Sequence, residues 1–500
     1  MRKQHSLFLV LFVNIYFYSL GQNTFIKSYT GGYLSSGSEI KQTFNGGVIL
    51  AGYIHEIGSS NYGYLVNTNL NGDTIWTKII DVEYINAIEQ TSDSGFILTG
   101  SIHNSVFNSS DIFLLKINSM GNFMWIKDYY DYLNWGNSVF QTADGGYVIA
   151  GDNGSGPIYA LIIKTDSTGT VAWNKKIMVG NNTYRNKAFQ AKDGNYIIHG
   201  LLEMNGGNDS AMYIAKLDSM GTLLWTKSYV TGSNNQSYDN NVSETPDGGL
   251  IFSGNNLTSG LLLKTDDNGD ALWEKAYNKN ITSLTVASDS GFIMTGFWDL
   301  LLTKTDSGGN IIWSKSLVDP GTISVGHSSL QSGNGSIFIL GDILPFGNVS
   351  EFLLEKTDEQ GGGCIEHNKS TTITSIPFQI ANPSITVTSP LINVSSPVPG
   401  ERSGSQVTEW CVAVKTNDPP DSNILSFFPN PYYTTLTLQF PHQQKEEAHL
   451  FIYNSIGEVA WQKEILMEDQ MLDLAELPPG LYLVNLKTKS GFFSSKIIRE

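Results

Sequence analysis

The sequence contains little of what most catalytic and metal-binding sites require. Only two of its 500 residues are cysteine and eight are histidine, and the histidines lack the spacing of metal ligands. No H-E-x-x-H, G-x-S-x-G, P-loop or C-x-x-C motif occurs. These absences exclude the common local signatures of metalloproteases, serine hydrolases and nucleotide-binding enzymes. They leave open a triad or carboxylate pair assembled from distant segments, and no metal or cofactor is expected.

Charge is also scarce. Charged residues make up 15% of the chain, and 47 acidic residues against 30 basic ones give a net charge of −17. Beyond the first residues there is no cluster of lysine and arginine, which argues against a nucleic-acid partner. Since no long segment keeps an apolar period of 3.6 residues, helix should be rare.

Long hydrophobic runs are limited to one, residues 7–20. It follows the positive residues Arg2 and Lys3, and small residues at 19 and 21 mark a cleavage site before Gln22. Its 14 residues are fewer than the roughly 20 that span a bilayer. We therefore expect residues 1–21 to be a signal peptide, and the mature chain to be exported without a transmembrane segment.

Glycine and aromatic residues are abundant, with 50 Gly, 23 Tyr and 24 Phe, a mixture typical of short strands and tight turns. A tryptophan follows a glycine by four residues six times, at Trp76, Trp125, Trp173, Trp225, Trp273 and Trp313. A second motif alternates with it: "NGGVILAG" (45–52), "DSGFILTG" (93–100), "DGGYVIAG" (144–151), "DGNYIIHG" (193–200), "DGGLIFSG" (247–254), "DSGFIMTG" (289–296) and the degraded "GNGSIFILG" (333–341). Recurrence every 40–52 residues indicates a repeated structural unit.

One unit reads as four short strands, at 85–91, 96–102, 111–118 and 123–130, joined by tight turns. Four strands in about 48 residues is the size of a β-propeller blade. Seven copies of the first three strands occur but only six of the tryptophan strand, and "TFIKSY" (24–29) resembles the missing one, with Phe25 at the tryptophan position. We predict an all-β protein in which residues 22–363 form a seven-bladed propeller closed by the N-terminal strand.

The repeat itself explains most of its recurring residues. Each tryptophan is expected to fill the layer between two blades, because a single blade leaves an apolar face uncovered. The recurring lysines, at 116, 164, 216, 264, 304 and 356, are interpreted as solvated or turn-bridging charges, and the aspartates at 166, 218, 266, 306 and 358 as turn formers. The repeat resembles the blades common in exported bacterial proteins. Its Asp–Gly–Trp rhythm is also similar to the tryptophan-docking blades of quinoproteins, with a turn one residue shorter.

The composition shifts at Cys364. Residues 364–423 are rich in Ser, Thr and Pro and predict an extended, edge-type segment that ends in a linker, "KTNDPPDSN" (415–423). The only two cysteines, Cys364 and Cys411, are expected to pair in an exported chain, although two separate thiols are the alternative.

Residues 424–500 alternate as about seven short strands of a small β-sandwich. The stretches "FFPNP" (427–431), "IYNSIGEVAWQ" (452–462), "LDLAELPPGLYLVNL" (472–486) and "SSKIIRE" (494–500) resemble the C-terminal sorting domain of type IX (Por) secretion cargo. The resemblance implies contact with the secretion machinery and delivery to the surface of a Gram-negative bacterium, where the domain is removed or attached to polysaccharide.

Topology indicates where a site would lie. The connections between the second and third strands, and between blades, vary most and share one face, where function usually sits on such scaffolds. The candidate ligand-binding residues there are Tyr132, Trp135, Tyr238, Trp298 and His103, with loop packing as the alternative. The first hypothesis is a secreted or surface propeller that binds a glycan or protein without turnover. The second is a polysaccharide-degrading enzyme or quinoprotein that uses the same face.

Overall fold

The structure is a computed structural model, and its regular elements are β-strands. It describes residues 23–30, 34–56, 61–105, 108–130, 134–154, 156–204, 206, 209–230, 241–256, 258–297, 300–318, 324–343, 350–365, 367–369, 371–374, 379–381, 385–388, 393–395, 401–402, 406–414, 426–428, 434–439, 444–454, 459–467, 470–487 and 492–499. The expected signal peptide lies outside these residues. Within them no helix could cross a membrane. The chain divides into two units, Met1–Lys415 and Thr416–Glu500.

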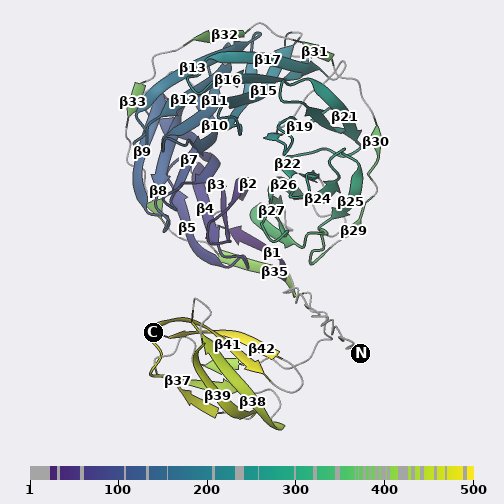
Figure 1. Cartoon of the computed structure of the whole chain (residues 1–500). Coiled ribbons are helices and arrows are strands. Elements are labelled where there is room, and N and C mark those ends of the chain that lie inside the picture. Colours follow the sequence, from purple (N-terminus) through teal and green to yellow (C-terminus); the bar gives the residue numbers. More distant parts are fainter. Residues whose placement is uncertain are drawn as a thin grey trace, which may run out of the picture. The chain divides into compact units, whose positions relative to one another are not determined.

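The first unit is a seven-bladed propeller (Figure 1). Each blade has four antiparallel strands, of which the first is innermost; they are consecutive in six blades, and the seventh takes its outer strand from the N-terminus. In chain order they are β2 (Leu34–Gln42), β3 (Val48–His55), β4 (Asn61–Thr68) and β5 (Thr74–Ile80); β6 (Tyr84–Gln90), β7 (Phe96–Asn104), β8 (Ser109–Ile117) and β9 (Phe123–Tyr130); β10 (Asn134–Gln141), β11 (Tyr147–Asn153), β12 (Tyr159–Thr165) and β13 (Val171–Val179); β14 (Thr183–Gln190), β15 (Tyr196–Met204), β16 (Asp209–Leu217) and β17 (Leu223–Val230); β18 (Asn241–Glu244), β19 (Leu250–Asn255), β20 (Gly260–Thr265) and β21 (Ala271–Tyr277); β22 (Ser283–Val286), β23 (Phe292–Thr295), β24 (Leu301–Thr305) and β25 (Ile311–Ser316); and β26 (Ser324–Gln331), β27 (Ile337–Ile343), β28 (Glu351–Thr357) and β1 (Asn23–Thr30).

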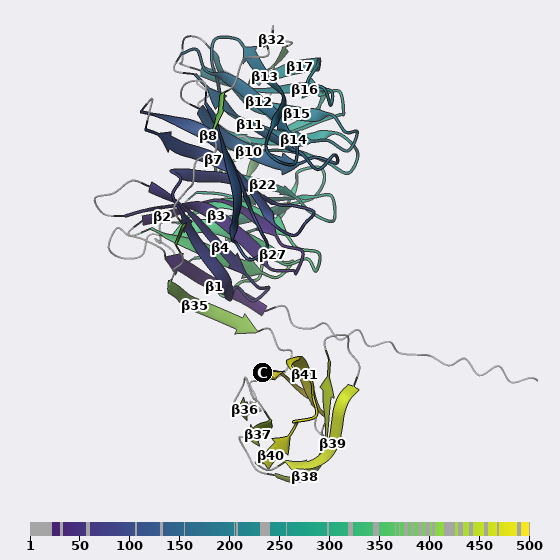
Figure 2. The same ribbon diagram turned by 90° about the vertical axis from the view of Figure 1, so that its left-hand side faces the viewer.

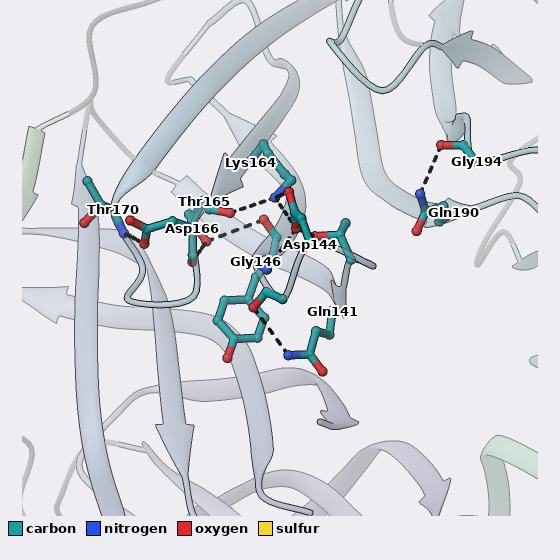
Figure 3. Close-up of polar contacts among 12 residues, drawn as sticks. Gln141, Asp144, Gly146, Lys164, Thr165, Asp166, Thr170, Gln190 and Gly194 are labelled. Carbon is teal, nitrogen blue, oxygen red and sulfur yellow. Dashed lines mark hydrogen bonds and ion pairs between the residues drawn. The ribbon is translucent and has the colours of Figure 1, made fainter. Parts of the chain in front are cut away.

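The two tight turns of a blade are held by one lysine and two aspartates, as the third blade shows (Figure 3). Asp144 accepts a hydrogen bond from the Gly146 amide at 2.9 Å, and Lys164 Nζ donates to the same carboxylate at 3.0 Å. In the next turn Asp166 accepts from the Thr170 amide at 2.9 Å. The same ion pair joins Lys116 to Asp93, Lys216 to Asp193, Lys264 to Asp247 and Lys304 to Asp289. These lysines bridge turns, but most are buried rather than solvated, because the ammonium reaches the turn from within the sheet.

Each repeat tryptophan lies against a glycine of the following blade. A Cβ on Gly221 would lie 3.1 Å from Cζ3 of Trp173, so any other residue would require the ring to move by a few tenths of an ångström. The equivalent pairs are Trp76 with Gly121, Trp125 with Gly169, Trp225 with Gly269, Trp273 with Gly309 and Trp313 with Gly361. The glycine that precedes a tryptophan by four residues therefore serves two purposes: it accepts a positive φ in its own turn and receives a ring of the preceding blade, which is a tryptophan in five of the six cases.

The N-terminal strand closes the ring with the same contact. β1 pairs antiparallel with β28 as the outer strand of the seventh blade, with Phe25 opposite Lys356. A Cβ on Gly72 of the first blade would lie 2.6 Å from the Phe25 ring. Tyr29 Oη donates to the carbonyl oxygen of Gly72 at 2.5 Å. Phe25 thus occupies the place that a tryptophan occupies at the other six blade junctions.

Residues 364–414, which we call the belt, add a fifth strand to all seven blades. The belt strands are β29 (His367–Asn368), β30 (Ile373–Thr374), β31 (Gln379–Ala381), β32 (Ile385–Thr388), β33 (Asn393–Ser395), β34 (Glu401–Arg402) and β35 (Gln406–Val414). In that order they pair with β25, β21, β17, β13, β9, β5 and β1. The belt therefore runs once around the outer rim, against the order of the blades (Figure 1).

Both cysteine positions of the belt lie beside β1. Sγ of Cys364 lies 3.7 Å from the carbonyl oxygen of Thr24, and Cys411 is the backbone register partner of Ile26. β35 follows the whole length of β1 in both views (Figure 1, Figure 2). The side chain of Cys411 lies outside the described residues, so the Cys364–Cys411 disulfide stays a prediction. The sequence analysis placed the propeller boundary at residue 363 and missed the pairing of the belt with the blades.

The second unit contains two antiparallel sheets. One has the order β36 (Ser426–Phe428), β37 (Thr435–Gln439), β40 (Gln470–Asp473), and the other β39 (Val459–Met467), β38 (Gln444–Tyr453), β41 (Gly480–Lys487), β42 (Phe492–Arg499). Side chains from both sheets, among them Leu438, Leu450 and Val484, form one core. Alternation along these strands produces that core, since every second residue faces inward.

Candidate functional site: the central channel

The first strands of all seven blades surround a cavity of about 470 Å³ at the centre of the ring. Its lining is polar. The charged side chains are Glu39, Lys41, Glu89, Lys187 and Glu244, and the hydroxyl side chains include Ser138, Ser243, Ser283 and Ser328. The volume is within the range of small-molecule sites. The ring therefore presents inward-facing hydroxyl, carboxylate and ammonium groups around one central space.

Many of these side chains also satisfy backbone groups of the neighbouring blade. The innermost strand of a sheet has an unpaired edge, and its N–H groups need acceptors. Ser138 Oγ accepts from the Ala188 amide at 2.8 Å, and Glu39 Oε2 accepts from the Ile88 amide at 2.8 Å. Ser283 Oγ accepts from the Ser329 amide, and Ser328 Oγ accepts from the Ile40 amide. One position of the first strand thus supplies an acceptor to the next blade at four junctions.

An ion pair and a half-buried carboxyl lie on the wall formed by blades one and two. Lys41 Nζ lies 2.9 Å from Glu39 Oε1, and this carboxylate raises the pKa of Lys41. Burial raises the pKa of Glu89, whose Oε1 accepts from the Gln141 amide at 3.2 Å. A carboxyl with a raised pKa in a cavity is chemically capable of proton transfer.

Blade four contributes a cation and a histidine to the same cavity. Lys187 and His199 are register partners on β14 and β15, so their side chains lie on the same face of the sheet. Burial lowers the pKa of Lys187. Burial, together with the charge of Lys187, lowers the pKa of His199 to about 3, and the imidazole is neutral at physiological pH.

At the end of the ring that carries the variable connections, two aspartates join neighbouring blades. Asp152 on β11 accepts hydrogen bonds from the backbone amides of Arg185 and Asn186, at 3.0 and 2.9 Å. Asp342, at the equivalent position of β27, accepts from the Gly37 amide at 3.0 Å and lies 2.7 Å from Nε2 of His327. These contacts fix the positions of the first strands around the channel.

The structure places the predicted ligand-binding residues unequally. Tyr132, Tyr238 and Trp298 lie outside the described residues. His103 is exposed, with Nδ1 4.0 Å from Glu83 Oε1. Trp135 is half-buried at the start of β10, opposite Asp152 in register. His103 and Trp135 do not line the cavity.

Sequence reasoning missed the channel residues because it searched the loops. A signal was present in the repeat: Lys187 and His199 stand where most blades have small or hydroxyl-bearing residues. Among the described residues no group of three or more His, Cys, Asp or Glu side chains could hold a metal ion.

Comparison with protein families settles the identity of the second unit. Residues 426–500 match the family described as secretion system C-terminal sorting domain. This segment belongs to that family. The chain is therefore a type IX secretion cargo with a propeller region, as the motifs between residues 427 and 500 predicted. The sorting domain indicates contact with the secretion machinery and a secreted or outer-surface location in a Gram-negative bacterium.

Solved structures similar to this chain include a streptogramin B lyase, with 12% identity and a TM-score of 0.43 over 68% of this chain and 100% of that one. A protein of unknown function from Dyadobacter fermentans has 9% identity and a TM-score of 0.42, covering 67% and 97%. The polysaccharide lyase Uly1 has 12% identity and a TM-score of 0.39, covering 65% and 90%. No curated protein sequence matches the chain. At these values the similarities carry no information about activity.

Proposed function

We propose that this secreted protein binds an extracellular glycan in the central channel of its propeller. The observation that carries the proposal is the cavity of about 470 Å³, lined by hydroxyl and charged side chains from all seven first strands. Sugars are recognised through many hydroxyl groups, which need donors and acceptors distributed around them. A serine whose oxygen accepts a backbone N–H, as Ser138 does, still has an O–H to donate to a ligand.

A binding role without turnover is favoured over catalysis by the contacts of the channel carboxylates. Glu39 and Glu89 each accept a backbone amide of the following blade, so the structure of the ring accounts for their presence. The second candidate is a polysaccharide-degrading enzyme. The raised pKa of Glu89 and the nearby Glu39–Lys41 pair support it, because a general acid must be protonated near the working pH.

The test is a glycan array probed with the full-length protein, followed by a reducing-end assay on every glycan that binds. Binding without release of new reducing ends supports the proposal. Release of reducing ends that disappears in E89Q would replace it with the enzyme. An array without any bound glycan would refute both.

A further inference from the structure

Two residues of blade four differ from those at the equivalent positions of the other six blades. Among the first strands, the position of Lys187 holds Glu39, Ser138, Ser283 or Ser328 in the four blades that supply an acceptor to the next blade, and Ala87 or Asn241 in the other two. A lysine ammonium has no acceptor and cannot play that part. Where a repeat breaks a local structural rule without structural gain, a functional reason is the first to consider.

The second difference is at His199, which lies opposite Lys187 on the neighbouring strand. Just before the last glycine of the repeated motif, the other blades have Ala51, Thr99, Ala150, Ser253, Thr295 and Leu340, whereas blade four has His199. His199 is 4% exposed, and its Nδ1 has no hydrogen-bond partner among the described residues. Lys187 likewise has no hydrogen bond or ion pair within the described part of the chain, whereas Lys41 on the opposite wall is paired with Glu39. Two unpartnered polar groups therefore meet in one cavity.

We infer that Lys187 and His199 form the recognition point for a carboxylate-bearing sugar, such as a uronic acid, in the channel. This inference rests on the proposed glycan-binding function. The ammonium of Lys187 would pair with the ligand carboxylate, since a partly buried cation is stabilised by an anion held within hydrogen-bond distance. His199 would exchange a hydrogen bond with a neighbouring ligand hydroxyl, and the serines of the facing blades would contact the remaining hydroxyls.

The charge balance of the cavity disfavours a multiply charged anion. Glu39, Glu89 and Glu244 face the same space as Lys41 and Lys187, so the lining carries three carboxyl groups against two amino groups. A phosphate ester, with nearly two negative charges, would meet about twice the repulsion that a single carboxylate meets. A neutral sugar would leave Lys187 without a counter-charge.

The experiment measures binding of glucuronate, galacturonate and mannuronate, with glucose as the neutral counterpart, to the full-length protein by titration calorimetry. The variants are K187Q, which removes the charge, K187R, which keeps it, and H199A. K463Q is the matched control, because it removes the same charge from an exposed position of the sorting domain. Thermal unfolding of each variant verifies that it folds.

We expect at least one uronate to bind at least tenfold more tightly than glucose. K187Q should lose at least tenfold in affinity for it and respond less to added salt, while K187R and K463Q stay within threefold of the wild type. H199A should weaken uronate and glucose alike. Unchanged uronate binding by folded K187Q, or equal binding of uronates and glucose, would overturn the inference and leave glycan binding standing. If no glycan on the array binds, the proposed function is overturned as well.

Discussion

Closure of the ring by β1 can be tested at one glycine. In G72A the added Cβ would lie 2.6 Å from Cε2 and Cζ of Phe25, about 1 Å inside normal carbon contact. Moving the ring that far in a packed layer costs about 1–3 kcal/mol. The residue also has φ +74°, and a Cβ there costs about 1–2 kcal/mol, partly offset by the lower entropy of the unfolded chain. We therefore expect G72A to lower the free energy of unfolding by about 2–4 kcal/mol.

Gly46 in the same blade provides the matched control. Its φ is +85°, and a Cβ built on it meets no atom within 4 Å. G46A thus carries the backbone cost alone, about 1 kcal/mol. The difference between the two variants isolates the contact with Phe25, and urea unfolding of the full-length protein, followed by tryptophan fluorescence, measures it.

A double-mutant cycle identifies the partner. F25L replaces the ring with a smaller aliphatic side chain, and it should lower the free energy of unfolding less in G72A than in the wild type, with a coupling free energy of about 1 kcal/mol or more. Equal stabilities of G72A and G46A, together with additivity of F25L and G72A, would refute closure of the ring through this contact.

Four further outcomes are expected. W173A should lower the free energy of unfolding by about 3 kcal/mol in urea titrations, because it leaves a space against Gly221; a loss below about 1 kcal/mol would contradict the packing. The hydrogen bond from Lys164 lowers the pKa of Asp144 to about 2, below the unfolded value of about 3.9. The contribution of ionised Asp144 to stability is therefore present above about pH 4 and lost as the pH falls towards 2. Between these pH values the melting temperature of D144A should depend less on pH than that of the wild type. Glu355 is fully buried, both its carboxylate oxygens are unpartnered among the described residues, and burial raises its pKa. The free energy of unfolding of the wild type should therefore fall as the pH rises above about 4.5. In denaturant unfolding, E355L should remove this pH dependence and raise the free energy of unfolding at pH 7 by about 1–3 kcal/mol. Truncation after Lys415 should leave the propeller folded but abolish surface delivery in cell fractionation, and surface display of the truncated protein would contradict the sorting assignment.

The blades were predictable because their determinants are local. Strand alternation, Asp-Gly turns and the Gly–Trp spacing recur within every 40–52 residues, so the unit, its number and the missing strand at Phe25 follow from the sequence. The channel was not found in this way. Lys187 and His199 lie on different strands, and their meeting in a cavity depends on register and on the closed ring. Comparing the seven copies position by position would have singled them out, since both depart from the repeat in the same blade.

The belt shows a different limit. Its individual strands are two to four residues long except for β35, so the sequence indicated an edge-type segment but not which blade each strand would join. Each belt strand forms because the outer strand of a blade has unpaired backbone groups, with which a short extended segment can form hydrogen bonds. Successive belt strands from β29 to β32 begin six residues apart, a length that spans about 20 Å when extended. The proline-rich composition that predicted an extended, edge-type segment suits this arrangement, because proline favours extended backbone and is tolerated on an outer edge. The belt thus covers the last open edges of all seven blades and is part of the propeller.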